Sequence, residues 1–324
     1  MAQVNGTNTQ SAGILADYQD VWMETRRAMD SRIGQVMDLS AVTNARTNTR
    51  AYFEAAPHMK YQPYGDPIVE QAMDSKQFSI TNYVYSVEVP YSRWDAEDDQ
   101  TGSLVESVRM AGRDGGLNPE RGLLDLLGNT TSFIPVVPNA ADGNAAFLTT
   151  TRWGNAAGNN DVASSWSASG PATRSAIWQA YKMMASYQDA HGQRWHPDDV
   201  LRSPLLIFGS SDDSDVIYEA LNMGMVAYAN STSNAGVDNV LPKKLRFEDP
   251  WLTPSIATGI FYIFLTGVPT KPFIMQDRSP IQMWDFNETN DPEAARSGRY
   301  AFVANQRLGF GVGLPGGAVK ITAA

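Results

Sequence analysis

Two clusters of carboxylates are the residues whose types and spacing could most readily support chemistry in this sequence. They comprise Asp95, Glu97, Asp98 and Asp99, and Asp212, Asp213 and Asp215. Paired carboxylates can act as general acid and base, and carboxylates at alternate positions can bind Ca²⁺. Neither cluster has the Asp-x-Asp-x-Asp-Gly spacing with a distal Glu that a calcium loop uses. Both precede helical patterns, and the N-terminus of a helix favours negative charge, so we predict that these residues cap helices.

The other motifs that could carry catalysis or bind a cofactor are absent or misplaced. The three histidines are His58, His191 and His196, and the last two are five apart without the glutamate of a metalloprotease helix. The chain contains no cysteine, which excludes disulfides and thiolate chemistry. The stretch 311–316 satisfies the Gly-x-Gly-x-x-Gly fingerprint, but only eight residues follow it, too few for the helix and strand that the motif needs. We therefore predict a glycine-rich turn there, and no catalytic residue, cofactor or metal site.

Charge and hydropathy limit the partners of the chain. Its formal net charge is −10, from 25 Lys and Arg against 35 Asp and Glu, without a basic run that could neutralise phosphates. Sequence-specific DNA binding is thus not expected, although an acidic protein can enclose DNA without gripping it. The longest apolar run, 256–268, is shorter than the ~18 residues of a membrane span and predicts a buried strand. The N-terminus lacks a signal-peptide pattern, which indicates a cytoplasmic protein.

The first half of the chain is predicted to contain helices and one long strand. The predicted elements are an amphipathic helix over 14–39, a tyrosine-rich strand over 78–91, helical segments over 95–128 and a short strand over 133–138. Gly115-Gly116 and Pro119 interrupt the second helical pattern. We therefore predict two helices in that region, the second beginning near Asn118 with Pro119 at its first position.

Beyond residue 171 the sequence alternates between helical and strand patterns. The predicted elements are a helix over 173–190, strands over 205–208, 240–247, 259–265 and 273–284, and a closing pair of strands within 300–321. Residues 210–215 are predicted to cap a helix that runs to Met223. The region 139–171 is a long loop rich in Gly, Asn, Ala and Ser.

Four stretches of the sequence, taken in order, resemble one known protein family. They are Tyr83–Val89 with Asp98–Gly102, Asp142–Phe147, Ala176–Phe208 and Arg299–Ile321. The first is similar to the family's extended loop and the start of its spine helix, the second to its Asp-Gly-x-x-x-Phe stretch, and the last to its closing strands. The third has a helix, then Asp-Ala-His-Gly, then Pro-Leu-Leu-Ile in the family's order. The chain thus resembles the major capsid proteins of tailed bacteriophages with the Hong Kong 97-type fold, closest to the Mu-like major head subunit family.

The resemblance implies an α+β fold with a division of labour along the chain. It implies an N-terminal arm with an amphipathic helix over 1–60 and an extended β loop over 61–94. A peripheral domain with the spine helix and the C-terminal strands would comprise 95–171 and 276–324, and an axial domain would comprise 172–275. The glycine pair within 95–128 departs from the continuous spine helix of the family.

The resemblance also implies function and partners. The chain would be a non-enzymatic head protein that self-assembles into hexamers and pentamers of an icosahedral shell enclosing phage double-stranded DNA. Its partners would be further copies of itself, a separate scaffold protein, the portal protein and a decoration protein, with no membrane. It would reside in the virion capsid, and in the host cytoplasm during assembly.

Large rigid side chains on the extended arm are the expected contacts between subunits. The candidates are Tyr83, Tyr85, Val87, Tyr91, Lys76 and Trp22. Cross-linking through Lys76 is a weaker hypothesis, because an exposed, solvated lysine is the usual case. Two other readings of the sequence stay open, namely a soluble α/β enzyme that uses Asp or Glu chemistry and a carbohydrate-binding module, the latter suggested by eight tryptophans and the Asn/Thr/Gly-rich loops.

Overall fold

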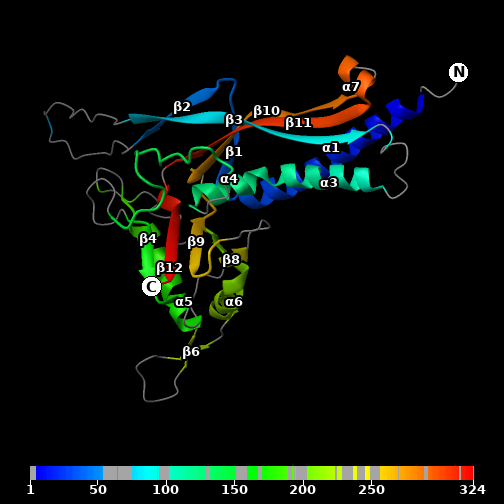
Figure 1. The fold of residues 1–324 in the computed structure, drawn as a ribbon. Coiled ribbons are helices and arrows are strands. Elements are labelled where there is room, and N and C mark those ends of the chain that lie inside the picture. The colour runs from blue at the N-terminus through cyan, green and yellow to red at the C-terminus, as the bar shows by residue number, and fades with distance from the viewer. Residues whose placement is uncertain are drawn as a thin grey trace.

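The computed structural model shows two main β-sheets with helices packed against them (Figure 1). The residues that the structure describes are 5–53, 64, 75–92, 94, 102–128, 132–150, 159–166, 170–188, 192, 194, 203–222, 225–227, 236–238, 245–248, 256–268, 270–287, 291–313 and 315–323. The first sheet is long and narrow and lies across the top of Figure 1, and the second lies below it. Helices and strands are mixed in both parts, so the predicted α+β class is confirmed.

The first sheet contains five strands in the order β1-β10-β11-β3-β2. They are β1 (Met37–Val42), β2 (Thr47–Phe53), β3 (Ser75–Ser92), β10 (Phe273–Phe286) and β11 (Arg299–Val312). β11 is antiparallel to both β10 and β3, whereas β1 is parallel to β10. The predicted strand over 78–91 is confirmed, but β1 and β2 were not predicted. β1 pairs only with residues 273–277, and β2 only with residues 75–81. The rest of the sheet is therefore three strands wide. We call it the far half; it consists of residues 82–92 of β3 with their partners in β11 and the adjoining part of β10.

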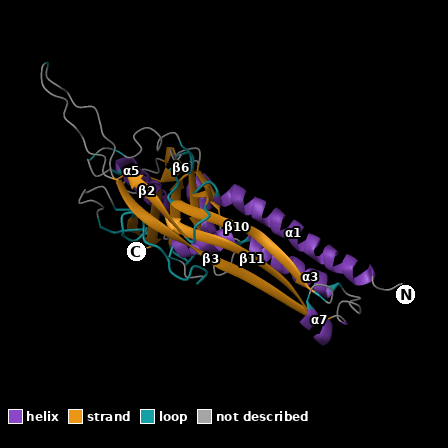
Figure 2. Ribbon diagram, turned by 90° about the horizontal axis from the view of Figure 1, so that it is seen from above, coloured by secondary structure: helices purple, strands orange, loops and turns teal. Residues whose placement is uncertain are grey.

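Three helices pack on one face of the first sheet and lie below it in Figure 1. They are α1 (Asn5–Ile33), α3 (Ser103–Gly116) and α4 (Asn118–Leu126). Seen from above, β3, β10 and β11 lie in front of α3, and α1 runs alongside them (Figure 2). The predicted break near Asn118 is confirmed, with Pro119 in the first turn of α4. The first helix was predicted to extend to Leu39, but it ends at Ile33 because Gly34 and the turn after it lead into β1.

Glycines in α3 allow α1 to approach it closely, and the last of them, Gly116, is also the residue at which α3 ends. A Cβ on Gly112 would lie 2.9 Å from the carbonyl oxygen of Tyr18, and one on Gly116 would lie 2.7 Å from the Cβ of Thr25. Tyr18 and Trp22 of α1 are buried there and pack against β11. The glycines of α3 therefore serve helix–helix packing, and the glycine pair coincides with the predicted end of the first helix.

The second sheet has the strand order β4-β12-β9-β5-β8. Its strands are β4 (Asp161–Ser164), β5 (Leu205–Gly209), β8 (Leu245–Glu248), β9 (Ile260–Leu265) and β12 (Ala318–Ala323). Phe261, Ile263 and Leu265 pack with the helices α5 (Gly170–Ser186) and α6 (Ser214–Asn222), while Tyr262 and Phe264 point into the core shared with the first sheet. Burial on both faces explains the continuous apolar run that predicted β9.

Smaller elements complete the described part of the chain. They are the 3₁₀ turns η3 (Ser211–Asp213) and η4 (Pro315–Gly317), the strand pair β6 (Met225–Ala227) and β7 (Gly236–Asp238), and the short helix α7 (Pro292–Ser297). The glycine-rich stretch near residue 313 connects β11 to β12 through η4, as the predicted turn requires. No described helix is long and apolar enough to cross a membrane.

Two sequence predictions are wrong. The closing strands do not pair with each other, because β11 belongs to the first sheet and β12 to the second, so residues 318–323 lie apart from the rest of 276–324. Residues 133–138 are irregular, with bends at 134–136 instead of a strand, and Pro135 and Pro138 cannot donate to a strand ladder. The first acidic cluster lies outside the described residues, so its capping role stays a prediction.

The second acidic cluster does precede a helix, as predicted. The hydroxyl of Ser210 accepts a hydrogen bond from the backbone N–H of Asp212, and α6 follows from Ser214. The Asp213 carboxylate accepts a bond from the backbone N–H of Gly259 at 2.8 Å. Burial raises the pKa of Asp213, an effect that the Gly259 bond partly opposes. The cluster therefore anchors the start of β9 to the start of α6.

Candidate assembly surface

The outer face of the first sheet is not covered by any described element of the chain. We call this face, in the far half of β3, β10 and β11, the outer face; the helices lie on the opposite side (Figure 1). Side chains alternate between the two faces, and three large apolar ones on the outer face are exposed. They are Val84 with 58% of its surface exposed, Trp284 with 42% and Phe286 with 41%. Exposed aromatic and aliphatic side chains on one sheet face are typical of an interaction surface.

The register of the strands aligns these side chains in rows across the sheet. Val303 lies between Trp284 on β10 and Glu88 on β3. Two positions along, Ala301 lies between Phe286 and Pro90 in the same manner. The outer face therefore presents an apolar patch with Glu88 as a charged member.

The strand β3 also has a free edge in its far half. β2 pairs with β3 only up to Thr81, and none of the described residues pairs with that side of β3 from Tyr83 to Ser92. The ladder to β11 on the other side is regular from Ser92 to Asn82, without a bulge. A long, regular strand with a free edge is a ready template for pairing with another chain.

The predicted contact residues in the far half of β3 lie on the inner face of the sheet, which is the face that the helices cover. Tyr85 stacks on Phe133 with 4.2 Å between ring centroids, and Tyr91 donates a hydrogen bond to Asp285 at 2.8 Å. Val87 packs against the cluster beneath the sheet. The alternation of side chains along β3 places these residues on one face of the strand. It does not show that the chain's own helices cover that face.

Two further predicted contact residues lie elsewhere. Lys76 is in the part of β3 that pairs with β2, opposite Tyr52. Trp22 is only 8% exposed and lies between α1 and α3 within the subunit. The sequence prediction missed Trp284 and Phe286 as candidate contact residues. Their positions alternate with Met283 and Asp285 along β10, and this alternation could have indicated that they share a face.

A cleft of about 360 Å³ lies between the far half of the sheet and the helices. Tyr18 and Trp22 line it from α1, Tyr85 from β3, and Asp114 and Arg121 from α3 and α4, where these last two form an ion pair. The described residues contain no group of three or more ligating side chains that could hold a metal ion. His58, His191 and His196 lie outside the described residues.

Buried tyrosines predict a loss of stability in alkaline solution. Burial raises the pKa of Tyr18 to about 12, with a smaller contribution from Asp114, and burial also raises the pKa values of Tyr85 and Tyr91. A raised folded-state pKa means that the neutral tyrosines stabilise the fold fully below their ordinary pKa of 10.0, and that this stability is lost as the pH rises through 10 to 12. We expect circular dichroism to show unfolding in this window, together with late phenolate absorbance. Titration of all 13 tyrosines near pH 10 with the fold intact would contradict this.

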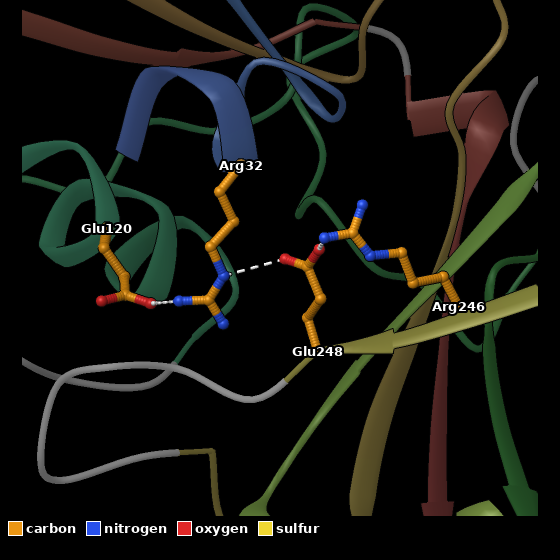
Figure 3. A network of polar contacts seen from close by, with 4 residues as sticks. All are labelled: Arg32, Glu120, Arg246 and Glu248. Atoms are coloured by element: carbon orange, nitrogen blue, oxygen red, sulfur yellow. Dashed lines mark hydrogen bonds and ion pairs between the residues drawn. The ribbon is translucent and has the colours of Figure 1, made fainter. Parts of the chain in front are cut away.

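The two sheets are joined by a buried ionic network that the sequence did not predict (Figure 3). Arg32, in the last turn of α1, reaches Glu120 of α4 with Nη1 at 3.2 Å from Oε1, and Glu248 of β8 with Nε at 2.8 Å from Oε2. Glu248 also forms an ion pair with Arg246. The Arg32 guanidinium lies 5.8 Å from the ring centroid of Phe208 in β5. We call Arg32, Glu120 and Glu248 the Arg32 joint.

Comparison with known proteins gives matches in a family model and in solved structures. Residues 12–194 match the family model described as Mu-like prophage major head subunit gpT. No curated protein matches the sequence. The capsid of a native GTA particle aligns with a TM-score of 0.57 at 12% identity, covering 90% of this chain and 89% of that chain.

Two further capsids align with similar scores. The mature capsid of bacteriophage PhiM1 gives a TM-score of 0.55 at 9% identity, covering 90% of this chain and 86% of that one. The capsid of cyanophage P-SCSP1u gives 0.53 at 12% identity, covering 89% and 86%. At such low identities these likenesses show the fold alone, and they confirm the Hong Kong 97-type capsid fold. The family model, however, matches more than half of the chain, in a range that includes most of α1, the long strand β3, α3 and α4. The chain therefore belongs to the Mu-like prophage major head subunit family and is a major capsid protein of a phage shell.

Proposed function

We propose that this capsid protein assembles into hexamers and pentamers that close an icosahedral shell around phage double-stranded DNA. The observation that carries the proposal is the far half of the first sheet, which has a bare apolar face and a free β3 edge among the described residues. A three-stranded sheet in that state is prone to associate with other chains. In a closed shell, the neighbouring copies would cover it.

The proposed division of labour follows the two sheets. The first sheet with α1, α3 and α4 would form the N-terminal arm, the extended loop and the peripheral domain. The second sheet with α5 and α6 would form the axial domain, which would meet its copies around the hexamer and pentamer axes. We assign β12 to the axial domain, because it pairs there with β4 and β9.

The extended loop would lie across a neighbouring subunit, and side chains of the outer face would contribute to the contact. Tyr85, Val87 and Tyr91 would act by fixing β3 against its own helices, so that the residues between them, such as Val84 and Glu88, are presented outward. The formal net charge of −10 is compatible with an inner wall that does not trap DNA by phosphate contacts.

The remaining partners follow from the role of a shell subunit. We propose a separate scaffold protein and a portal protein, a decoration protein on the outside, and assembly in the host cytoplasm before the chain becomes part of the virion. We assign no catalytic role to the chain and no cofactor.

The outer face provides a direct prediction. Replacing Trp284 by glutamate should leave the fold intact, because 42% of the side chain is already exposed, and should reduce the yield of shells at least tenfold. The yield is measured by sedimentation of assembled particles, and the fold by circular dichroism. The matched control is Met110→Glu on the exposed side of α3, where 63% of the side chain is exposed. Equal yields from the two variants would show that the outer face is not a contact between copies.

Negative-stain electron microscopy of the chain expressed with its neighbouring genes tests the proposed function itself. We expect closed shells, or rings of six and five subunits. Uniform small particles, in preparations that contain the scaffold protein, would contradict the proposed assembly.

A further inference from the structure

We propose that Arg32 is a positioning residue that sets the angle between the two sheets and thereby the curvature of the shell. The inference rests on the proposed function, since a curvature exists only if copies assemble into a shell. It concerns a joint within one subunit, where each partner of Arg32 belongs to a different element.

The Arg32 joint links three segments that are far apart in the sequence. Arg32 is at the end of α1, Glu120 is in α4 on the first sheet, and Glu248 is in β8 at the edge of the second sheet. One planar guanidinium therefore bonds a carboxylate from each of the two layers (Figure 3). Its distance of 5.8 Å from the ring centroid of Phe208 adds a second contact with the second sheet.

Because the three side chains of the Arg32 joint are buried, the energy of their interaction depends strongly on their relative positions. Glu120 has no exposed side-chain surface, and the side chains of Arg32 and Glu248 are 10% and 8% exposed. Charges removed from water require well-aligned partners, because any displacement leaves a desolvated charge. A change in the angle between the sheets would move the two carboxylates relative to one guanidinium, so the network favours one angle.

The rest of the contact between the two sheets is mainly apolar. It restricts the angle between the sheets less than the Arg32 joint does. The shared core contains Phe264 of the second sheet and Phe273 of the first, whose ring centroids are 6.0 Å apart. Apolar packing is non-directional, and a core can accommodate small shifts of one layer on another.

Among the described residues, other directional bonds also join the layers. The Tyr262 hydroxyl donates to the carbonyl oxygen of Leu127 at 2.7 Å, and Lys271 Nζ donates to the carbonyl oxygens of Gln35 at 2.8 Å and Thr266 at 3.0 Å. Carbonyl oxygens accept hydrogen bonds over a broad range of directions, whereas the planar guanidinium of Arg32 fixes the relative positions of two carboxylates.

Hydrophobic replacement of the whole joint separates positioning from stability. Buried ion networks can often be replaced by packed apolar side chains of similar volume without loss of stability. The test variant is therefore Arg32→Met with Glu120→Met and Glu248→Met, expressed with the neighbouring genes. We expect a folded subunit with an unfolding midpoint near that of the unaltered protein. We also expect its shells to have a distribution of diameters about twice as wide, because no guanidinium then fixes the relative positions of α4 and β8.

A second variant covers the case in which the triple replacement does not fold. Arg32→Lys keeps the charge but replaces the planar fork by an ammonium group with three rotatable donors, which does not fix the relative positions of the two carboxylates. It should broaden the diameters in the same way. Arg246→Gln is the control, since that side chain is 64% exposed and touches only the outer end of the network.

The outcomes distinguish the inference from the function on which it rests. Uniform shells of unaltered diameter from a folded triple variant, or from Arg32→Lys if the triple variant does not fold, would overturn the inference and leave the proposed function standing. Absence of shells from the unaltered protein would overturn both. Broadened diameters in the Arg32 variants and uniform ones in Arg246→Gln would establish the positioning role.

Discussion

Replacing Arg32 by leucine is expected to lower the free energy of unfolding by about 3–5 kcal/mol. The physical reason is that Glu120 and Glu248 lose the guanidinium that both of them contact, while they stay at 0% and 8% exposure. Removing one partner of a buried ion network is far more costly than replacing the whole network, because charge is left behind in a medium that solvates it poorly. Urea denaturation of the unassembled subunit measures the change.

The control for this prediction is found in the same network. Arg246 also contacts Glu248, but its side chain is 64% exposed, so Arg246→Gln should cost less than about 1 kcal/mol. A loss below about 1 kcal/mol in Arg32→Leu as well would mean that water or a shift of β8 compensates the carboxylates, and would contradict the assigned burial.

Replacing Gly122 by alanine is expected to destabilise the subunit by about 1–3 kcal/mol, although alanine is the better helix former. A Cβ at this position of α4 would overlap the ring of Phe310 in β11, and both residues are buried in the core between the sheets. The helix and the strand would have to separate, or the ring would have to leave its rotamer. Thermal and urea unfolding of the unassembled subunit measure the effect.

A double-mutant cycle assigns that loss to the contact itself. Phe310→Leu creates space at the same position, so Gly122→Ala should cost less in the Phe310→Leu background than in the unaltered protein. Gly317→Ala is the matched control, because the nearest atom to its Cβ would be Cβ of Leu265 at an ordinary 3.5 Å. If the effects of Gly122→Ala and Phe310→Leu are additive, the contact between residue 122 and the Phe310 ring does not cause the loss. Backbone flexibility at residue 122 would then explain the change in stability.

Much of the second sheet could be predicted from the sequence, and the reason is its burial. The strands β5 and β9 lie in the interior of that sheet with both faces covered, so each is a short continuous apolar run. The break between α3 and α4 was equally predictable, because Pro119 fits only the first turn of a helix. In these cases a local rule and the tertiary environment agree.

The first strands could not be predicted, because their patterns depend on distant partners. β1 pairs with β10, and although Met37–Val42 alternates apolar and polar residues, this run is too short to distinguish a strand from the end of the helical pattern over 14–39. The closing strands were correctly located but wrongly paired, since the sequence does not show that the chain passes to the other sheet between β11 and β12.

The candidate surface was only half predictable for a related reason. Alternation along β3 places Tyr85 and Tyr91 on one face, but both faces are compatible with the pattern until the helices are placed. Asp285 faces inward and accepts the Tyr91 hydroxyl bond, which reverses the usual rule for a carboxylate on a strand. In the sequence, Arg32 and Glu120 resemble ordinary charged residues on the exposed side of a helix. Only their burial in the structure reveals the Arg32 joint.

The strand order of the first sheet has a consequence for synthesis of the chain. β3 has β11 as its long partner, and β11 is synthesised only after α3, α4, the strands β4, β5, β8 and β9 of the second sheet, and β10. The outer-face rows need three strands, so Glu88 of a nascent chain has no Trp284 or Val303 beside it until β10 and β11 have been made. Such non-local pairing slows folding, and it also delays the appearance of a surface that could associate. The order of the strands thus delays association through the outer face between growing chains on one messenger RNA.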